Sequence, residues 1–315
     1  MASPVTPDAV RAAYSMISRH LRRTPLFAPP RGAFGVDADV TLKLELFQHA
    51  GSFKPRGAFF NLASRKIPQA GVAAASGGNH GAAVAYAAQQ FGVKARIFVP
   101  EISSPAKVAA IRRFGAEAVI GGARYYDALD SCLDYIAQSG AMQVSAFDSI
   151  ETISGQGTVA LEWEEQSGAP DTVLIAVGGG GLISGVASFW GKRVKIVGVE
   201  PEGSRALHAA LAAGRDVDVD VNSVAADSLG AKTVGPLVYS VCAPVVDHVA
   251  LVSDDAIVDA QRTLWRDFRI ASEPGGATAL AALLSGAFKP KPGEKVGVLV
   301  CGGNVDLTKL AEIAS

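Results

Sequence analysis

Apolar positions along the chain follow two periods that alternate over most of its length. Short runs of β-branched and other apolar residues predict strands at 39–45, 72–75, 95–99, 117–120, 172–177, 194–199 and 296–300. Apolar residues spaced three and four apart predict helices at about 80–91, 105–114, 125–139, 182–190, 203–213, 254–269 and 276–286. This alternation predicts an α/β fold with mostly parallel twisted sheets flanked by helices.

Composition narrows the possible partners. The 315 residues are 49% hydrophobic, so the chain can bury a sizeable core. Lys and Arg total 29 against 30 Asp and Glu, and no block of like charge offers nucleic acid or an acidic membrane a surface. The uncharged stretch at 172–191 is long enough to span a bilayer. Its run of four glycines breaks the helix that lipid requires, so we expect no membrane partner.

The three cysteines, Cys132, Cys242 and Cys301, are widely spaced and form no CxxC pair. This spacing is typical of a reducing compartment and argues against a disulfide framework or a structural zinc site. The first residues, MASPVTPDAVRAAY, lack a basic region followed by an apolar run. We therefore expect no signal peptide, a cytoplasmic location and no metal site.

Three glycine-bearing loops lie where a strand or loop leads into a helix. They are GSFKPRG at 51–57, SGGNHG at 76–81 and GGGG at 178–181. In open α/β sheets, ligands bind at such strand-to-helix connections. The sequence therefore predicts three loops around one ligand.

The four-glycine loop follows the apolar strand TVLIAV and precedes the predicted helix LISGVASFW. Backbone N–H groups in such a loop can turn toward an anion, and the helix N-terminus adds a partial positive charge. A phosphate site is the favoured interpretation, because a simple tight turn needs only one or two glycines. The alternative is a dinucleotide site, with Glu200 near a ribose hydroxyl. That alternative leaves the other two loops unexplained.

Lys54 lies ahead of a predicted helix that begins at about Pro55. A lysine is usually a solvated surface charge. Lys54 differs because Phe53, Phe59 and Phe60 are close to it in sequence. A desolvated amine has a lowered pKa and becomes a competent nucleophile and base.

The loop at 76–81 also opens a predicted helix. Its N–H groups are suited to a carboxylate, and the Asn79 amide is suited to a ring hydroxyl. For His80, a structural or orienting role is favoured over a catalytic one, because the backbone of the loop suffices to bind an anion.

The motifs GSFKPRGA, SGGNHGAAVAYAA, GQGTVALE, VGGGGLISG, VGVEPEG, SEPGGA and CGGNVDL, in this order, resemble the serine/threonine dehydratase family. Its members are pyridoxal-phosphate enzymes of the tryptophan-synthase-β fold type, also called fold type II. The resemblance extends from about Thr24 to Leu307. It implies two lobes with the cofactor between them: a large lobe of 1–45 and 146–315, and a small substrate-side lobe of 46–145. It also implies a homodimer.

The resemblance assigns roles to individual residues. Lys54 is the catalytic residue and holds the cofactor as an imine, and Cys301 faces the pyridine nitrogen as a neutral partner. The implied cofactor-binding residues are Phe53, Lys54, Asn79, Gly178, Gly179, Gly180, Gly181, Leu182 and Cys301. The implied substrate-binding residues are Ser52, Ser76, Gly77, Gly78, Asn79 and His80.

The chain departs from some family patterns. Serine racemases of the family carry a serine ahead of Gly-Asn-His-Gly, proposed as a second base, where this chain has Gly77; this puts racemisation in doubt. Metal-activated relatives have an aspartate six residues after the glutamate, where this chain has Ala206 after Glu200. The usual divalent site is therefore incomplete, and we expect no metal.

The resemblance implies loss of water and ammonia from a small β-hydroxy amino acid, with L-threonine or L-serine as the default substrate. Arg124, with Tyr125 and Tyr126, leaves hydroxyaspartate open as a substrate if Arg124 pairs with a second carboxylate, although a surface position for Arg124 is favoured. An aryl-serine is also open. The alternatives of other classes are a racemase, an NAD-dependent oxidoreductase and a degenerate amino-acid-binding protein.

Overall fold

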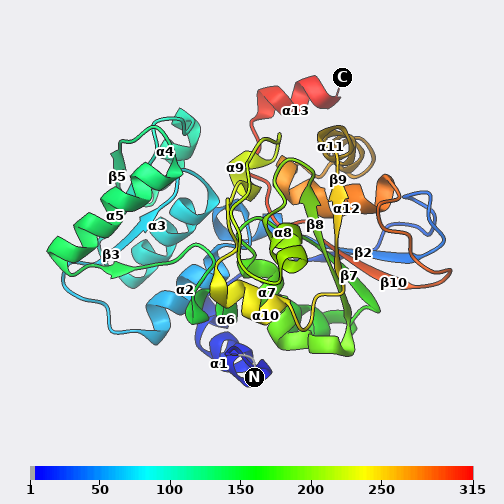
Figure 1. The fold of residues 1–315 in the computed structure, drawn as a ribbon, viewed down its shortest axis with the longest axis horizontal. Helices are drawn as coiled ribbons and strands as arrows, with labels where there is room; N and C mark the ends of the chain where they lie inside the picture. Colours follow the sequence, from blue (N-terminus) through cyan, green and yellow to red (C-terminus); the bar gives the residue numbers. More distant parts are fainter. Residues whose placement is uncertain (1–3, 315) are drawn as a thin grey trace.

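The computed structural model describes residues 4–314, which form two sheets with helices packed around them (Figure 1). The six-stranded sheet has the order β1 (Leu26–Phe27), β2 (Asp39–Lys43), β10 (Lys295–Leu299), β7 (Thr172–Ala176), β8 (Lys195–Pro201), β9 (His248–Val252). Within it, β1 pairs antiparallel with β2 and the other neighbours are parallel. The four-stranded sheet is parallel throughout, in the order β5 (Glu117–Ile120), β4 (Ala95–Val99), β3 (Val72–Ala75), β6 (Met142–Gln143).

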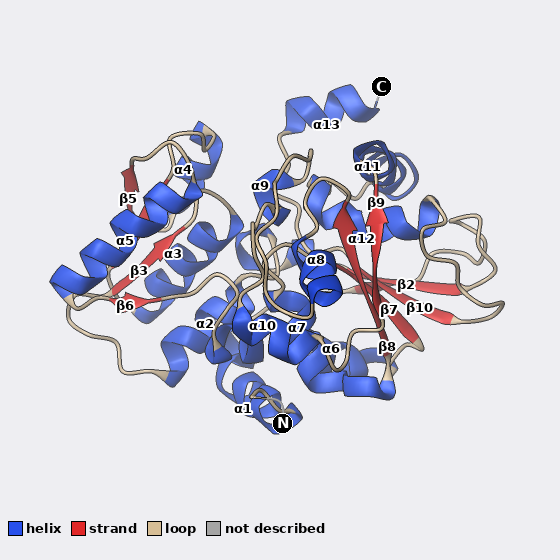
Figure 2. Cartoon of the chain, viewed as in Figure 1, coloured by secondary structure: helices blue, strands red, loops and turns tan. Residues whose placement is uncertain are grey.

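Most helices lie between the strands in sequence, and helices cover both sheets (Figure 2). Those up to the middle of the chain are α1 (Pro7–Ile17), α2 (Pro55–Ser64), α3 (Asn79–Phe91), α4 (Pro105–Arg113), α5 (Tyr125–Ser139) and α6 (Ile150–Ser167). The later ones are α7 (Gly181–Trp190), α8 (Ala206–Ala213), α9 (Ala226–Leu229), α10 (Pro236–Cys242), α11 (Asp254–Phe268), α12 (Pro274–Leu284) and α13 (Leu307–Ala314). Short 3-10 turns are η1 (Ser18–His20), η2 (Glu45–Phe47), η3 (His49–Gly51) and η4 (Gly191–Arg193). No helix among residues 4–314 is long and apolar enough to cross a membrane.

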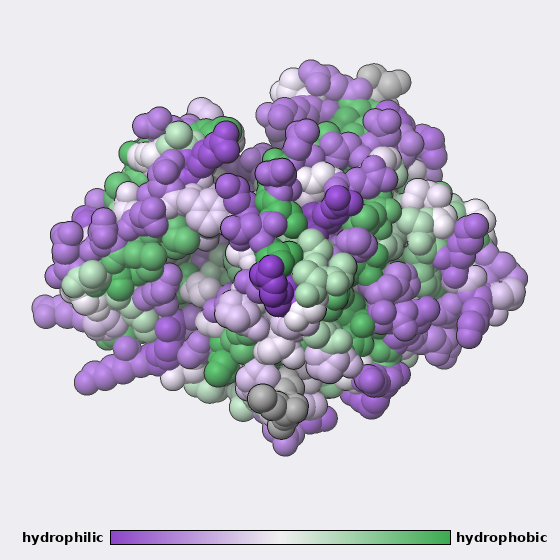
Figure 3. Space-filling view, in the orientation of Figure 1, coloured by the Kyte–Doolittle hydropathy of each residue, from purple (hydrophilic) through white to green (hydrophobic). Residues whose placement is uncertain are grey.

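The predicted α/β class with mostly parallel sheets is confirmed, and each sheet has its own apolar core. All strands of the four-stranded sheet lie within 46–145, and all strands of the six-stranded sheet lie outside that range. The lobe boundaries themselves stay a prediction. The face drawn in Figure 3 mixes hydrophilic with scattered hydrophobic residues.

Local patterns missed several elements. The strands β1, β6 and β9 and the helices α1, α6, α9, α10 and α13 lie outside the predicted ranges, and α8 begins at Ala206 rather than at 203. In α6, glycines weaken the helical signal but allow close packing. A Cβ on Gly157 would lie 2.7 Å from the Gly185 carbonyl oxygen of α7. Close packing of α6 against α7 therefore stabilises α6 as a helix although its local propensity is weak.

A network of buried charges links the segments just before and just after Lys54 to each other and to α6. Lys43, Glu45, Arg56 and Glu162 come from β2, η2, α2 and α6, and their side chains are at most 1% exposed. The Arg56 Nε and Nη2 atoms donate to the two carboxylate oxygens of Glu45, each at 2.7 Å. Arg56 Nη2 also lies 3.0 Å from Glu162 Oε2, and Lys43 Nζ lies 2.7 Å from Glu162 Oε1.

These pairings offset the cost of removing four charges from water. Burial raises the pKa of Glu162, but the adjacent Arg56 and Lys43 outweigh it and hold that pKa below its usual range. Because Arg56 lies two residues after Lys54 at the start of α2, the network fixes that helix start against α6 and β2.

We predict that Glu162→Gln, which keeps the shape and removes the charge, lowers the unfolding free energy by about 3–5 kcal/mol, because Lys43 and Arg56 are left with one carboxylate. Urea unfolding measures the change. The control is Asp37→Asn, which breaks the exposed pair with Arg31 and should leave stability nearly unchanged. A loss below about 1 kcal/mol for Glu162→Gln would contradict a stabilising role of the network.

Candidate active site

A cavity of about 250 Å³ opens where β3, β4, β7 and β10 end. Every predicted site residue except Ser52 lines it. Ser52 is fully buried, pairs its backbone with Gly302, and its hydroxyl has no hydrogen-bond partner within the described residues 4–314. The three glycine-bearing loops therefore meet around one space, as their positions at strand ends predict.

Lys54 stands at the N-terminal end of α2 with its side chain in the cavity. Its Nζ donates to the Ala146 carbonyl at 3.0 Å and lies 5.2 Å from the centre of the Phe53 ring. Burial lowers the pKa of Lys54 to about 8, against weaker opposing effects of Cys301 and Glu273. At pH 7 about a tenth of this amine is therefore unprotonated, far more than of an ordinary lysine.

The segment around Lys54 is joined to the chain that follows β10. Phe53 N donates to the Cys301 carbonyl at 3.1 Å. The Cys301 thiol is buried, lies 3.5 Å from the Gly275 carbonyl oxygen, and has its pKa raised by burial. Cys301 is therefore a neutral group at the cavity wall.

The four glycines between β7 and α7 lie too close to their neighbours for any side chain. A Cβ on Gly179 would lie 2.3 Å from the Phe147 ring, and one on Gly178 would lie 2.9 Å from Leu229 Cα. Gly180 has φ of +80°, and α7 begins at Gly181. The loop thus presents backbone at the N-terminus of a ten-residue helix, an arrangement suited to a phosphate.

The Asn79 amide is held from two sides. Its Nδ2 donates to Glu273 Oε1 at 2.5 Å, and its Oδ1 accepts from Asn304 Nδ2 at 2.7 Å. Burial raises the pKa of Glu273 to about 7, against lowering effects of Asn79, Lys107 and Lys54. The motif-based interpretation assigned no role to Glu273 or Asn304, although they lie in the motifs SEPGGA and CGGNVDL.

His80 is buried, and its Nε2 donates to the Val144 carbonyl at 2.9 Å. Burial, with a contribution from Lys54, lowers the pKa of His80 to about 3. The ring is therefore neutral at physiological pH and anchors the start of α3, which supports the orienting role.

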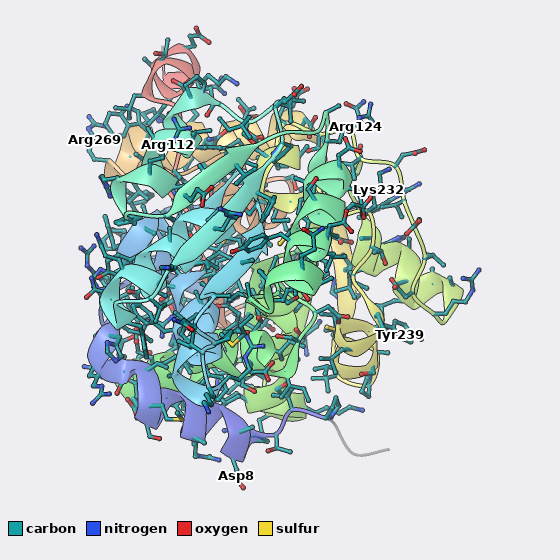
Figure 4. All side chains as sticks on the ribbon, turned by 90° about the vertical axis from the view of Figure 1, so that its left-hand side faces the viewer. Asp8, Arg112, Arg124, Lys232, Tyr239 and Arg269 are labelled. Atoms are coloured by element: carbon teal, nitrogen blue, oxygen red, sulfur yellow. The ribbon has the colours of Figure 1, made fainter. Side chains whose placement is uncertain are left out.

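The three residues considered for recognition of the substrate side chain do not all face the cavity. Tyr125 lines the cavity, whereas Arg124 and Tyr126 are exposed and do not line it. In Figure 4, Arg124 lies at the edge of the molecule near Lys232, whose amine stands over the Tyr126 ring. Arg124 therefore does not face a substrate in the cavity.

Glu200 contradicts the dinucleotide interpretation. It is fully buried outside the cavity, and its carboxylate accepts from the Leu207 and His208 amides at 2.9 and 2.8 Å, where it caps α8. Burial raises the pKa of Glu200 to about 8 despite these two bonds. It is thus unavailable to a ribose hydroxyl. Within residues 4–314, no three His, Cys, Asp or Glu residues gather as a metal site.

Comparison with known proteins identifies the family. The family model for pyridoxal-phosphate dependent enzymes matches residues 17–302. The chain belongs to this family. It is 37% identical over 312 residues to a phenylserine dehydratase of Ralstonia pickettii, a match that covers 97% of the chain and 95% of the relative.

Two further likenesses cover nearly the whole chain. An L-threonine ammonia-lyase of Thermotoga maritima is 32% identical over 98% of this chain and 78% of its own. The structure of maize serine racemase superposes with a TM-score of 0.92 and 36% identity, over 98% of this chain and 96% of that one. The predicted pyridoxal-phosphate cofactor, fold type II and membership of the serine/threonine dehydratase type are confirmed, and with them an enzyme of the carbon–oxygen lyase class.

The lowered pKa predicts how this pyridoxal-phosphate enzyme takes up its cofactor. We expect the rate at which Lys54 of the cofactor-free protein attaches pyridoxal phosphate to rise with pH and to level off above about 8, because the ammonium form below that pH is not nucleophilic. Borohydride trapping after brief mixing at pH 6–10, followed by peptide mass spectrometry, measures attachment at Lys54. A rate that still climbs well above pH 9 would show that burial does not lower this pKa.

Proposed function

We propose that the chain removes water and ammonia from a small β-hydroxy amino acid, L-threonine or L-serine, to give a 2-oxo acid. The observation that carries the proposal is the cavity itself, where an amine of lowered pKa, a glycine loop at a helix start and an asparagine loop converge. Relatives named for dehydration and ammonia loss support it.

The residues present fit pyridoxal phosphate. We propose that Gly178, Gly179, Gly180, Gly181 and Leu182 hold its phosphate, because a Cβ at any of these glycines would meet another residue within 3 Å and the α7 N-terminus is adjacent. Phe53 would pack beside the ring, Asn79 would donate to the ring hydroxyl oxygen and Cys301 would face the ring nitrogen. Glu273 and Asn304 fix the amide plane of Asn79.

When bound, pyridoxal phosphate supplies the electron sink for the pair of electrons released at Cα. Lys54 would hold the cofactor through its amine, and the same amine, when free, would take the Cα proton. The loop 76–80 holds the substrate carboxylate through the Gly77 amide, because the Ser76 amide already donates to the Phe98 carbonyl and the Gly78 amide to Ser76 Oγ. The buried thiol of Cys301 carries no charge, which favours prompt loss of the β-hydroxyl. The enamine product hydrolyses to the 2-oxo acid and ammonia.

A second candidate substrate is an aryl-serine. The phenylserine dehydratase likeness favours it, and so do Pro100, Ile102 and Tyr125, which line the cavity with apolar surface. Hydroxyaspartate has less support, because Arg124 lies outside the cavity and Lys107 is paired with Asp227 at 2.9 Å. Racemisation is supported by the likeness to serine racemase, but Gly77 offers no side chain as a second base.

We also propose a cytoplasmic homodimer. Three free, buried cysteines among residues 4–314 support a reducing compartment. Phe47 and Ile150 are large apolar side chains that stay half exposed on the single chain, and we propose that a second copy covers them.

The Lys54 proposal predicts that Lys54→Ala lowers 2-oxo acid formation by at least about a hundred- to ten-thousand-fold, the usual loss for a positioned base. The glycine loop and Asn79 should still retain some cofactor, so rates are compared at matched cofactor content. Lys192→Ala is the control, because Lys192 is exposed outside the cavity. Turnover of Lys54→Ala within about tenfold of the parent would assign the chemistry to another residue.

The substrate class is tested with L-threonine, L-serine, phenylserine and hydroxyaspartate, scored by 2-oxo acid release. We expect the highest kcat/KM for L-threonine or L-serine and the lowest for hydroxyaspartate, because Lys107, the lining cation besides Lys54 among residues 4–314, is already paired with Asp227. A phenylserine value about tenfold above both aliphatic substrates would establish the second candidate, since one favourable apolar contact is worth roughly that factor.

A further inference from the structure

The space beside Gly77 is filled by a side chain from another loop. A Cβ added to Gly77 would lie 1.8 Å from Ser103 Oγ, 2.9 Å from Ser103 Cβ and 3.3 Å from Pro100 Cδ. Both Gly77 and Ser103 line the cavity. A hydroxyl therefore occupies the place that a side chain at position 77 would take, although it comes from the β4–α4 connection.

The β4–α4 connection is anchored at several points. Glu101 N donates to the Gly122 carbonyl at 2.9 Å, and Ser103 N donates to the Pro100 carbonyl at 3.0 Å. The backbone amides of Lys107 and Val108 donate to the Ser104 carbonyl where α4 begins. These bonds fix the backbone that presents the Ser103 hydroxyl to Gly77.

The Ser103 hydroxyl has no hydrogen-bond partner among residues 4–314, and the residue is half-buried at the cavity wall. The Gly77 N–H group next to it also lacks a partner within that part of the chain. Two unused donors from different loops thus stand side by side. Paired donors of this kind are suited to an anionic acceptor such as a carboxylate.

We propose that Ser103 binds the substrate: its hydroxyl donates to the amino-acid carboxylate beside the amide of Gly77. The inference rests on the proposed function, which places the carboxylate at the loop 76–80. It adds a contact from the β4–α4 connection, so that the substrate joins two loops of the four-stranded sheet.

The test titrates the cofactor-loaded enzyme with glycine, which has a carboxylate but no leaving group, and with ethylamine, which has no carboxylate. The change in cofactor absorbance gives each Kd. We expect Ser103→Ala to weaken glycine binding about ten- to a hundredfold, the usual loss for a hydrogen bond to a charged group. Ethylamine binding and the thermal unfolding midpoint should stay close to those of the parent, and Ser103→Thr should keep most of the glycine affinity.

A second experiment moves the hydroxyl from position 103 to position 77, since side chains at these two positions would occupy the same volume. Gly77→Ser alone should also weaken glycine binding, because two side chains then compete for one volume. In the double variant with Gly77→Ser and Ser103→Gly, the hydroxyl returns to the same place from position 77. We expect this variant to bind glycine more tightly than Ser103→Gly alone.

Three results would overturn the proposal: glycine affinity of Ser103→Ala within about twofold of the parent, equal losses for glycine and ethylamine, or no gain in the double variant. The expected loss for a charge-assisted bond is well above twofold. Because glycine cannot eliminate, these titrations do not depend on lyase activity. A parent enzyme that binds glycine but releases no 2-oxo acid from any β-hydroxy amino acid would refute the proposed function alone.

Discussion

The buried guanidinium of Arg56 is the constraint on which the site depends. A fully buried charge requires partners of opposite charge. Glu45, which precedes Arg56 in the sequence, and Glu162, which follows it, supply them. Their geometry fixes the start of α2 against β2 and α6, and Lys54 lies two residues before Arg56. The position of the reactive amine is therefore set by an electrostatic network that does not itself line the cavity.

Burial has opposite consequences for the groups inside the cavity. It lowers the pKa of Lys54 to about 8 and that of His80 to about 3, and it raises the pKa of Glu273 to about 7. The amine is consequently available as a base near neutrality, while the histidine stays neutral and holds the backbone at Val144. One physical effect thus prepares the lysine for chemistry and limits the histidine to orientation.

Local patterns were sufficient for seven of the ten strands among residues 4–314 and for the glycine-bearing loops, because apolar runs and helix-start residues act within a few positions of the chain. They were insufficient for α6, where contact with α7 at Gly157 overrides weak helix propensity. Glu200 shows the opposite error. Its spacing from the glycine loop matched a dinucleotide site, but the folded chain turns its carboxylate into the cap of α8. Spacing along the sequence does not specify the direction in which a side chain points.

Glu273 and Asn304 lie in recognised motifs, but the motifs assigned them no role, because each acts through one contact with the amide of Asn79, which is more than 190 residues away in each case. Gly77 and Ser103 are a second case in which a contact between distant positions decides the content of the site. A glycine in a motif is read as an absent side chain, yet here the volume it leaves is occupied by a hydroxyl from the next strand-to-helix connection. The chemical groups in a folded site depend on which side chains fill its volume, whatever loop they come from. A motif that lacks a group at one position therefore does not establish that the folded site lacks it.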